Sequence, residues 1–256
     1  MTGTAVYLYA VTRGPDRPVP EGLTGVSGTP VRTVEHAGLA AVVSSVPLAE
    51  YGADALRDNL EDLVWLEQTA RAHHAVVVAV AQAAATAPVR LTTIFHDGHR
   101  VAGLLDDRGD QIRHALARVA GHAEWGVKVY GDSARPSPEP EPEPITAGRP
   151  GTAYLRQRNR QRRGAEQAAR QLAAHTGRIH DTLAAHATAV HTHRHQDPRL
   201  SGHSGIMLSN TAYLVAHRER VGFTAAAEQL GAAVTGVEVE VTGPWPAYSF
   251  ATLQDP

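Results

Sequence analysis

Residues 241–250 read Val241-Thr242-Gly243-Pro244-Trp245-Pro246-Ala247-Tyr248-Ser249-Phe250, in a chain where aromatic residues make up only 5% of the sequence. Proline fixes its own φ angle and disfavours helical geometry in the residue before it, so residues 243–246 are predicted to be extended. The segment would be a stiff ribbon that holds Trp245, Tyr248 and Phe250 in place. Because such rings bury large areas, this aromatic tail predicts either a clamp onto the chain's own fold or contact with a partner. The clamp is favoured.

The stretch before the tail, Val237–Val241, alternates valine and glutamate, a pattern typical of a half-exposed strand. Upstream of it, the hydrophobic patterns predict a strand, a helix, two strands and a second helix at residues 125–130, 152–190, 191–196, 205–215 and 218–233. The resulting order, βαββαβ, is that of a ferredoxin-like domain. We therefore expect a C-terminal ferredoxin-like domain over residues 123–256 that ends in the extended aromatic tail.

Residues 133–150 interrupt that domain between its first strand and first helix. Proline and glutamate alternate there, as in Pro138-Glu139-Pro140-Glu141. Such a sequence favours solvated polyproline II and packs no core, so a disordered linker or loop insertion is predicted.

The first half of the chain predicts a separate N-terminal domain, residues 1–122, a mixed α/β-sheet domain in which strands and helices alternate. The run Ala5–Val11 is apolar on both faces, as in a central buried strand. A hairpin over 31–35 and 39–46, a strand over 89–95 and two short helices over 99–120 are also expected. A long helix is predicted from Asn59 to Ala85. Its expected apolar stripe comprises Leu60, Leu63, Val64, Ala70, His74, Val77, Ala81 and Ala84. The fold class is thus α+β with two domains.

The composition excludes several classes of function. The chain has 256 residues, a formal net charge of −2 and no cysteine. The near-neutral charge gives no chain-wide argument for nucleic acid or membrane binding. The lack of cysteine excludes disulfides and thiolate catalysis. The start lacks a basic, apolar leader, and no stretch is long and apolar enough to span a bilayer, so neither a signal peptide nor a membrane span is expected.

The sequence shows no specific catalytic motif. No glycine-rich phosphate loop follows a strand, and Ser201-Gly202-His203-Ser204-Gly205 has histidine where a nucleophile elbow needs serine. No base, nucleophile and orienting group fall into a credible grouping. We therefore expect a protein that is not an enzyme, with no cofactor and no metal.

Two local patterns leave other functions open. One face of a predicted strand would carry His191, His193 and His195, which suggests a metal-sensing or small-ligand module. Residues two apart on a strand lie roughly 6.5 Å apart, too far for the outer pair to reach one ion. A polar strand face is therefore favoured. The run from Arg156 to Arg163 suggests RNA binding, although its arginines spread around the helix and are expected to pair with the glutamate-rich insertion.

Three further residues stand out. Arg90 lies in an otherwise apolar predicted strand, where burial would require a carboxylate or backbone partner. His73 and His74 are neighbours on the long helix and point about 100° apart, so they cannot chelate together. One of them is expected at the edge of the core and the other towards solvent.

The assembled pieces resemble the gas vesicle protein F/L family. Val6-Tyr7-Leu8-Tyr9-Ala10-Val11 is similar to its opening strand, and Pro88–Phe95 is similar to its central pattern. Glu124-Trp125-Gly126-Val127-Lys128-Val129 resembles the start of its second domain. The most specific matches are Asn210-Thr211-Ala212-Tyr213-Leu214-Val215 and the aromatic tail.

The resemblance implies an intracellular, non-enzymatic accessory or minor structural protein of gas vesicle formation. Its expected partners are the hydrophobic major shell protein and other accessory gas vesicle proteins, with no nucleic acid and no membrane. It would be found with the vesicle shell, or in the cytoplasm during assembly. Arg90, Trp245, Tyr248 and Phe250 are the candidate structural or partner contacts.

Overall fold

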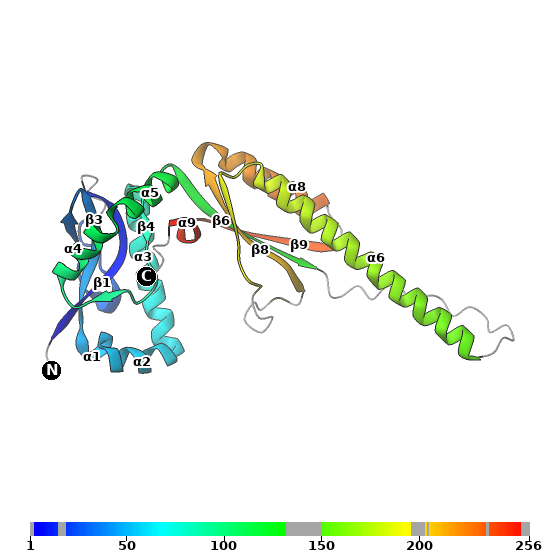
Figure 1. Ribbon diagram of the computed structural model, residues 1–256, viewed down its shortest axis with the longest axis horizontal. Coiled ribbons are helices and arrows are strands. Elements are labelled where there is room, and N and C mark those ends of the chain that lie inside the picture. Colours follow the sequence, from blue (N-terminus) through cyan, green and yellow to red (C-terminus); the bar gives the residue numbers. More distant parts are fainter. Residues whose placement is uncertain are drawn as a thin grey trace. The chain divides into compact units, whose positions relative to one another are not determined.

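The computed structural model describes residues 3–14, 19–131, 150–195, 203, 205–233 and 236–251, with backbone alone for 150–155. These residues form two antiparallel sheets and their helices, which confirms the predicted α+β class (Figure 1). Contacts divide the chain into two compact units. The first unit comprises Met1–Glu124 and Pro244–Pro256, and the second comprises Trp125–Gly243.

The first sheet is centred on β1 (Thr4–Arg13) and has the order β2-β3-β1-β4. Its partners are β2 (Val31–His36), β3 (Leu39–Pro47), β4 (Ala87–Pro88) and β5 (Ile94–Phe95). β1 pairs antiparallel with β3 on one edge and with β4 and β5 on the other. Because neighbours cover both edges and helices cover both faces, the apolar run Ala5–Val11 is buried throughout, as predicted.

The predicted hairpin is confirmed as β2 and β3. Its two-residue loop, Ala37 and Gly38, has φ values of 49° and 75°. Positive φ at both central positions is the geometry of a type I′ turn, whose twist matches that of the flanking strands.

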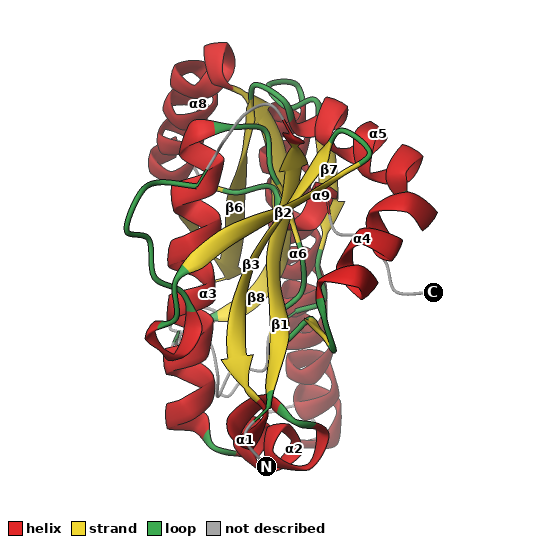
Figure 2. Cartoon of the chain, turned by 90° about the vertical axis from the view of Figure 1, so that its left-hand side faces the viewer, coloured by secondary structure: helices red, strands yellow, loops and turns green. Residues whose placement is uncertain are grey.

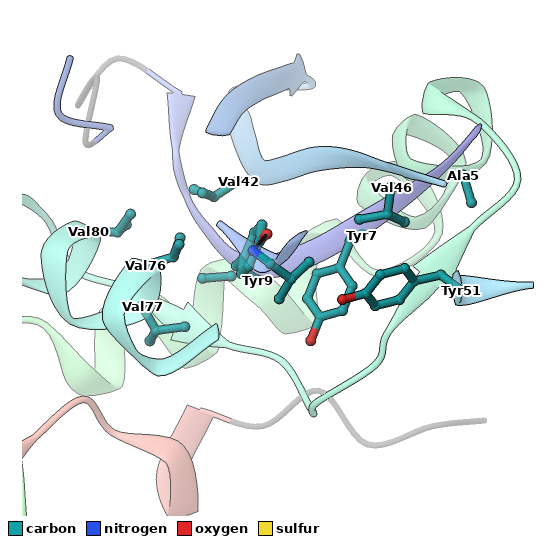
Figure 3. Close-up of a cluster of buried hydrophobic side chains, with 11 residues drawn as sticks. Ala5, Tyr7, Tyr9, Val42, Val46, Tyr51, Val76, Val77 and Val80 are labelled. Carbon is teal, nitrogen blue, oxygen red and sulfur yellow. Dashed lines mark hydrogen bonds between the residues drawn. The ribbon is translucent and has the colours of Figure 1, made fainter. Parts of the chain in front are cut away.

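Helices cover the two faces of the first sheet. α3 (Leu63–Ala83) contacts β1 from one side, whereas α4 (Gly98–Asp107) and α5 (Gly109–Val119) contact the sheet from the other (Figure 2). The predicted pair of short helices is therefore confirmed. On the α3 side, Val76, Val77 and Val80 pack against a layer that includes Tyr7 and Tyr9 (Figure 3).

The predicted single helix over Asn59–Ala85 is wrong. The chain forms α1 (Leu48–Tyr51) and α2 (Ala53–Glu61), then breaks at Asp62, whose ψ of 108° is extended, before α3 begins. The break occurs because the Asp62 carboxylate caps α3, accepting from the backbone N–H groups of Val64 and Trp65.

The expected apolar stripe was also displaced. The buried face of α3 consists of Thr69, His73, Val76, Val77 and Val80. Of the residues assigned to the stripe, Leu60, Leu63 and Val64 are 41%, 78% and 64% exposed. The break at Asp62 separates Leu60 from α3, and Leu63 and Val64 lie in the first turn of α3, ahead of its buried face; Val77 of the predicted stripe is buried.

The predicted strand over 89–95 is replaced by a turn between two short strands, β4 and β5. Thr92 has a φ of 59°, which a continuous strand does not allow. The buried Tyr7 hydroxyl accepts a hydrogen bond from the Thr92 backbone N–H at 3.0 Å and so holds this turn against the sheet. Arg90 therefore lies on an exposed turn, and the expectation of a buried arginine is wrong.

The second unit contains β6 (His122–Gly131), α6 (Pro150–Ala184), β7 (Ala189–Thr192), β8 (Ile206–Ala216), α8 (Arg220–Ala233) and β9 (Val237–Trp245), with the short η3 (His217–Glu219) before α8. Its sheet has the order β7-β8-β6-β9. Ile179 and Leu183 of α6 and Phe223 of α8 pack against Trp125 and Tyr213 of the sheet. The sequence predicted the strands and the two long helices of this unit, with three differences. α6 ends at Ala184 and not at Val190, β7 spans 189–192 and not 191–196, and η3 was not predicted.

The aromatic tail differs from its prediction in two ways. β9 runs extended to Trp245, as the prolines required, but the chain then forms a short helix, α9 (Tyr248–Ala251). The predicted second domain, residues 123–256, included the tail, whereas Pro244–Pro256 cluster with the first unit. The tail therefore contributes to the N-terminal core. Most of the predicted insertion at 133–150 lies outside the described residues.

Candidate functional site

Three contacts hold α9 in the first unit. Glu124, at the end of the first part of this unit, is 8% exposed and accepts hydrogen bonds from the Ser249 backbone N–H and hydroxyl, each at 2.7 Å. Phe250 is 7% exposed, and the Arg118 guanidinium of α5 lies 5.7 Å from the centre of its ring. The third contact is made by Tyr248. Together these contacts make α9 a clamp built into the fold.

Tyr248 and Trp245 both meet His74 of α3. The Tyr248 hydroxyl lies 3.1 Å from His74 Nδ1, and the Trp245 ring packs edge-on to the imidazole at 5.5 Å between centroids. Burial and the nearby Glu124 carboxylate raise the pKa of Tyr248. Trp245 nevertheless remains 41% exposed. Of the three predicted tail contacts, Phe250 and Tyr248 therefore serve the clamp, while Trp245 presents part of its ring to solvent.

His73, the neighbour of His74, lies in the core. It is 4% exposed, and its Nδ1 lies 3.1 Å from the Tyr7 hydroxyl. The His73 pKa is lowered to about 4, mainly by burial; a hydrogen bond with the Val89 backbone opposes this shift, and the neighbouring His74 adds to it. The imidazole is therefore neutral at pH 7. The pair was expected to divide into a core-edge and a solvent-facing residue, but His73 is buried and His74 is half-buried against the tail.

A second carboxylate ties α1 to the rest of the first unit. Glu50 Oε1 accepts from the indole N–H of Trp65 at 2.8 Å, and Glu50 Oε2 accepts from the Ser27 hydroxyl at 2.8 Å. Sequence reasoning missed both Glu50 and Glu124. Neither had a distinguishing pattern, because their partners lie far away along the chain.

A groove of about 810 Å³ lies in the first unit and is named here the α4 groove. Its apolar lining consists of Leu8, Val89, Ile94, Phe95 and Leu104, and its charged lining of Arg90, Arg100, Arg108 and Asp107. His96, His99, Thr93 and Gly103 complete it. Arg90 is thus the one predicted site residue that lines this groove. No sequence pattern indicated the groove, because α4 and the turn at 89–96 meet only in the folded chain.

The histidine and arginine patterns of the second unit form no built site in the described chain. His191 and His193 lie side by side, with ring centroids 4.8 Å apart, but no group of three or more His, Asp or Glu among the described residues is arranged to hold a metal ion. Five arginines of the predicted basic run are exposed on α6, namely Arg156, Arg158, Arg160, Arg162 and Arg163. Arg162 pairs with Glu166 of the same helix at 2.9 Å. Among the described residues, no helix has both the length and the apolar character needed to cross a membrane.

The model of the family described as gas vesicle synthesis protein GvpL/GvpF matches residues 5–252. This match spans both units and includes α9. The chain belongs to the GvpL/GvpF family. The resemblance found in the sequence is therefore confirmed, and the chain is a gas vesicle family protein.

Individual relatives agree with the family match. The chain is 41% identical to gas vesicle protein L of Streptomyces sp. (strain CB03234) over 97% of its own length and 93% of the relative. It is 27% identical to gas vesicle protein F of the same organism, over 96% and 99%. The crystal structure of GvpF from Anabaena sp. PCC7120 has the same fold, with a TM-score of 0.70, 18% identity and coverage of 99% and 98%. Family membership supports a role in gas vesicle assembly.

Proposed function

We propose that this GvpL/GvpF family member is a non-enzymatic accessory or minor structural protein that binds the hydrophobic major shell protein during vesicle assembly. The observation that carries the proposal is the family match over residues 5–252, which involves almost the whole chain and not one shared module. We place the protein inside the cell, at the vesicle shell or in the cytoplasm while the shell is built. Other accessory gas vesicle proteins are further proposed partners.

The first unit offers an apolar surface suited to such a partner. Leu63 and Val64 at the start of α3 are 78% and 64% exposed, and Leu60 at the end of α2 is 41% exposed. Contiguous exposed apolar surface on a folded chain is typical of interaction sites. We name these three residues the α2–α3 corner and propose it as the shell-protein contact.

The predicted contact residues divide into two roles in this proposal. Trp245 is partly exposed and is a candidate partner contact, as is Arg90 on its exposed turn. Tyr248 and Phe250 act structurally, because their rings face His74 and Arg118 within the first unit.

The second unit is proposed to be ferredoxin-like. Its element order β6-α6-β7-β8-α8-β9 and its strand order β7-β8-β6-β9 support that description, since a split βαβ unit places its first and third strands side by side. The antiparallel pairing of β7 with β8 also fits.

Co-purification with the major shell protein tests the proposed function. The tagged full-length chain should retain the shell protein, and the double variant Leu63→Gln/Val64→Gln should retain much less. Val221→Gln is a matched control, because Val221 is 73% exposed on α8 of the second unit. Normal vesicles in a deletion strain would contradict the proposal. Failure of the wild-type chain to retain the shell protein would contradict it as well.

A further inference from the structure

The α4 groove combines an apolar floor with a cationic rim. Leu8 and Val89 form the buried part of the floor, and Ile94, Phe95 and Leu104 are only partly covered by the described chain. Three arginines line the groove against one carboxylate, Asp107. A ligand that fits must therefore present apolar groups to the floor and negative charge to the rim.

Gly103 leaves room along the groove. It lies inside α4 and lines the groove, although glycine in a helix interior costs about 1 kcal/mol relative to alanine. A Cβ built at Gly103 would meet no atom within 4 Å, so the packing of this chain does not require a glycine there. The missing side chain instead keeps one wall of the groove open.

The rim is suited to carboxylates. Arg100 is exposed near the start of α4 and lines the groove, and its backbone N–H donates to the Asp97 carboxylate. Guanidinium groups bind carboxylates through two parallel hydrogen bonds, which adds orientation to attraction. Apolar grooves with charged rims are a common way to bind an amphipathic segment.

We propose that the α4 groove binds an acidic amphipathic polypeptide segment of a partner protein. Apolar side chains of the segment pack on Ile94, Phe95 and Leu104, and its carboxylates pair with Arg100. The inference goes beyond the proposed function, because the groove is chemically unlike the α2–α3 corner. The corner is flanked by carboxylates such as Glu61 and Asp62, whereas the groove is lined by arginines.

The test measures binding of labelled amphipathic peptides to the full-length chain by fluorescence anisotropy. The peptides are roughly 15 residues long, which allows helix formation, and share one pattern of leucines. Their polar positions carry glutamate, lysine or serine. The glutamate peptide should bind at least tenfold more tightly than the other two, and its affinity should fall as salt is added.

Two variants locate the binding. Gly103→Leu fills the groove from its open wall and should weaken binding of the glutamate peptide at least tenfold without unfolding the chain, since leucine is the better helix former. Its control is Gly177→Leu on α6, where a Cβ also meets nothing within 4 Å. Arg100→Glu should likewise weaken binding, while Arg57→Glu on exposed α2 should not. Thermal unfolding verifies that each variant is folded.

Three results overturn the proposal: equal binding of the glutamate and lysine peptides, an unchanged affinity in Gly103→Leu, or binding of dodecanoate in the groove when no peptide binds. The last result would assign the groove to a free anionic amphiphile. Shell-protein co-purification is measured on the same variants. Retained shell protein with lost peptide binding leaves the proposed function intact, so failure of one inference is distinguishable from failure of the other.

Discussion

The carboxylate of Glu124 accepts two hydrogen bonds from Ser249, one from its backbone N–H and one from its hydroxyl, each at 2.7 Å and across 125 positions of sequence. Glu124 ends the first stretch of the N-terminal unit, and Ser249 lies on α9, the helix that completes this unit. The two bonds therefore join the two stretches of one unit. A charged acceptor with two short bonds makes a stronger tie than a neutral pair.

Removing this acceptor should weaken the clamp. Glu124→Ala is expected to lower the free energy of unfolding by about 2 kcal/mol, because it removes the buried, charged acceptor of both Ser249 hydrogen bonds. Glu124→Gln keeps one acceptor oxygen and should cost less. Chemical denaturation measures both. The exposed Glu21→Gln provides the control, and an equal effect of the Glu124 and Glu21 variants would show that the bonds add nothing.

The two rings at the ends of the tail should differ in their contribution to stability. Phe250→Ala should cost about 3 kcal/mol, since Phe250 is 7% exposed. Trp245→Ala should cost about 1 kcal/mol, because its ring is 41% exposed. Thermal or chemical unfolding of the two variants measures the difference. The reverse order would mean that Trp245, and not Phe250, anchors the tail.

The buried His73 predicts a pH dependence. Its pKa in the folded chain, about 4, lies below the usual 6.5, so the unfolded chain binds more protons between these values. The free energy of unfolding should therefore fall as the pH drops through this window, by about 3 kcal/mol in full below pH 4. His73→Gln keeps an acceptor for the Tyr7 hydroxyl and should flatten the curve.

Val76→Ala serves as the control for that experiment. It removes buried methyl groups from the same face of α3 and should lower stability at every pH without flattening the curve. An identical pH profile for the wild type and His73→Gln would mean that His73 gains its proton equally well in both states.

The start of α3 depends on its cap. Asp62→Ala removes the acceptor for the N–H groups of Val64 and Trp65 and should cost about 1 kcal/mol. Asp58→Ala, on the exposed part of α2, should stay within about 0.5 kcal/mol of the wild type. Circular dichroism during urea unfolding compares them. If Asp62→Ala is as stable as Asp58→Ala, the interruption between the two helices has another cause.

Local patterns predicted most of the elements, because alternation and helical spacing reflect which face is buried. The strand at Ala5–Val11 and the hairpin loop at Ala37 and Gly38 follow from such patterns. The break at Asp62 also had a local sign, an aspartate directly before an apolar run, but the long apolar spacing concealed it. The α4 groove and the Glu124–Ser249 contact had no local sign, because each joins residues that only the fold brings together.

The division of the first unit into two stretches of sequence, Met1–Glu124 and Pro244–Pro256, bears on the order of events during synthesis. The ribosome completes the whole of Trp125–Gly243 before it makes α9. Until then Glu124 lacks Ser249, and the place that Phe250 will occupy beside Arg118 is empty. The residues of the second unit are therefore all available for folding before the first unit is complete, and the N-terminal core gains its last helix late. Truncation before Pro244 removes that helix from an otherwise complete domain.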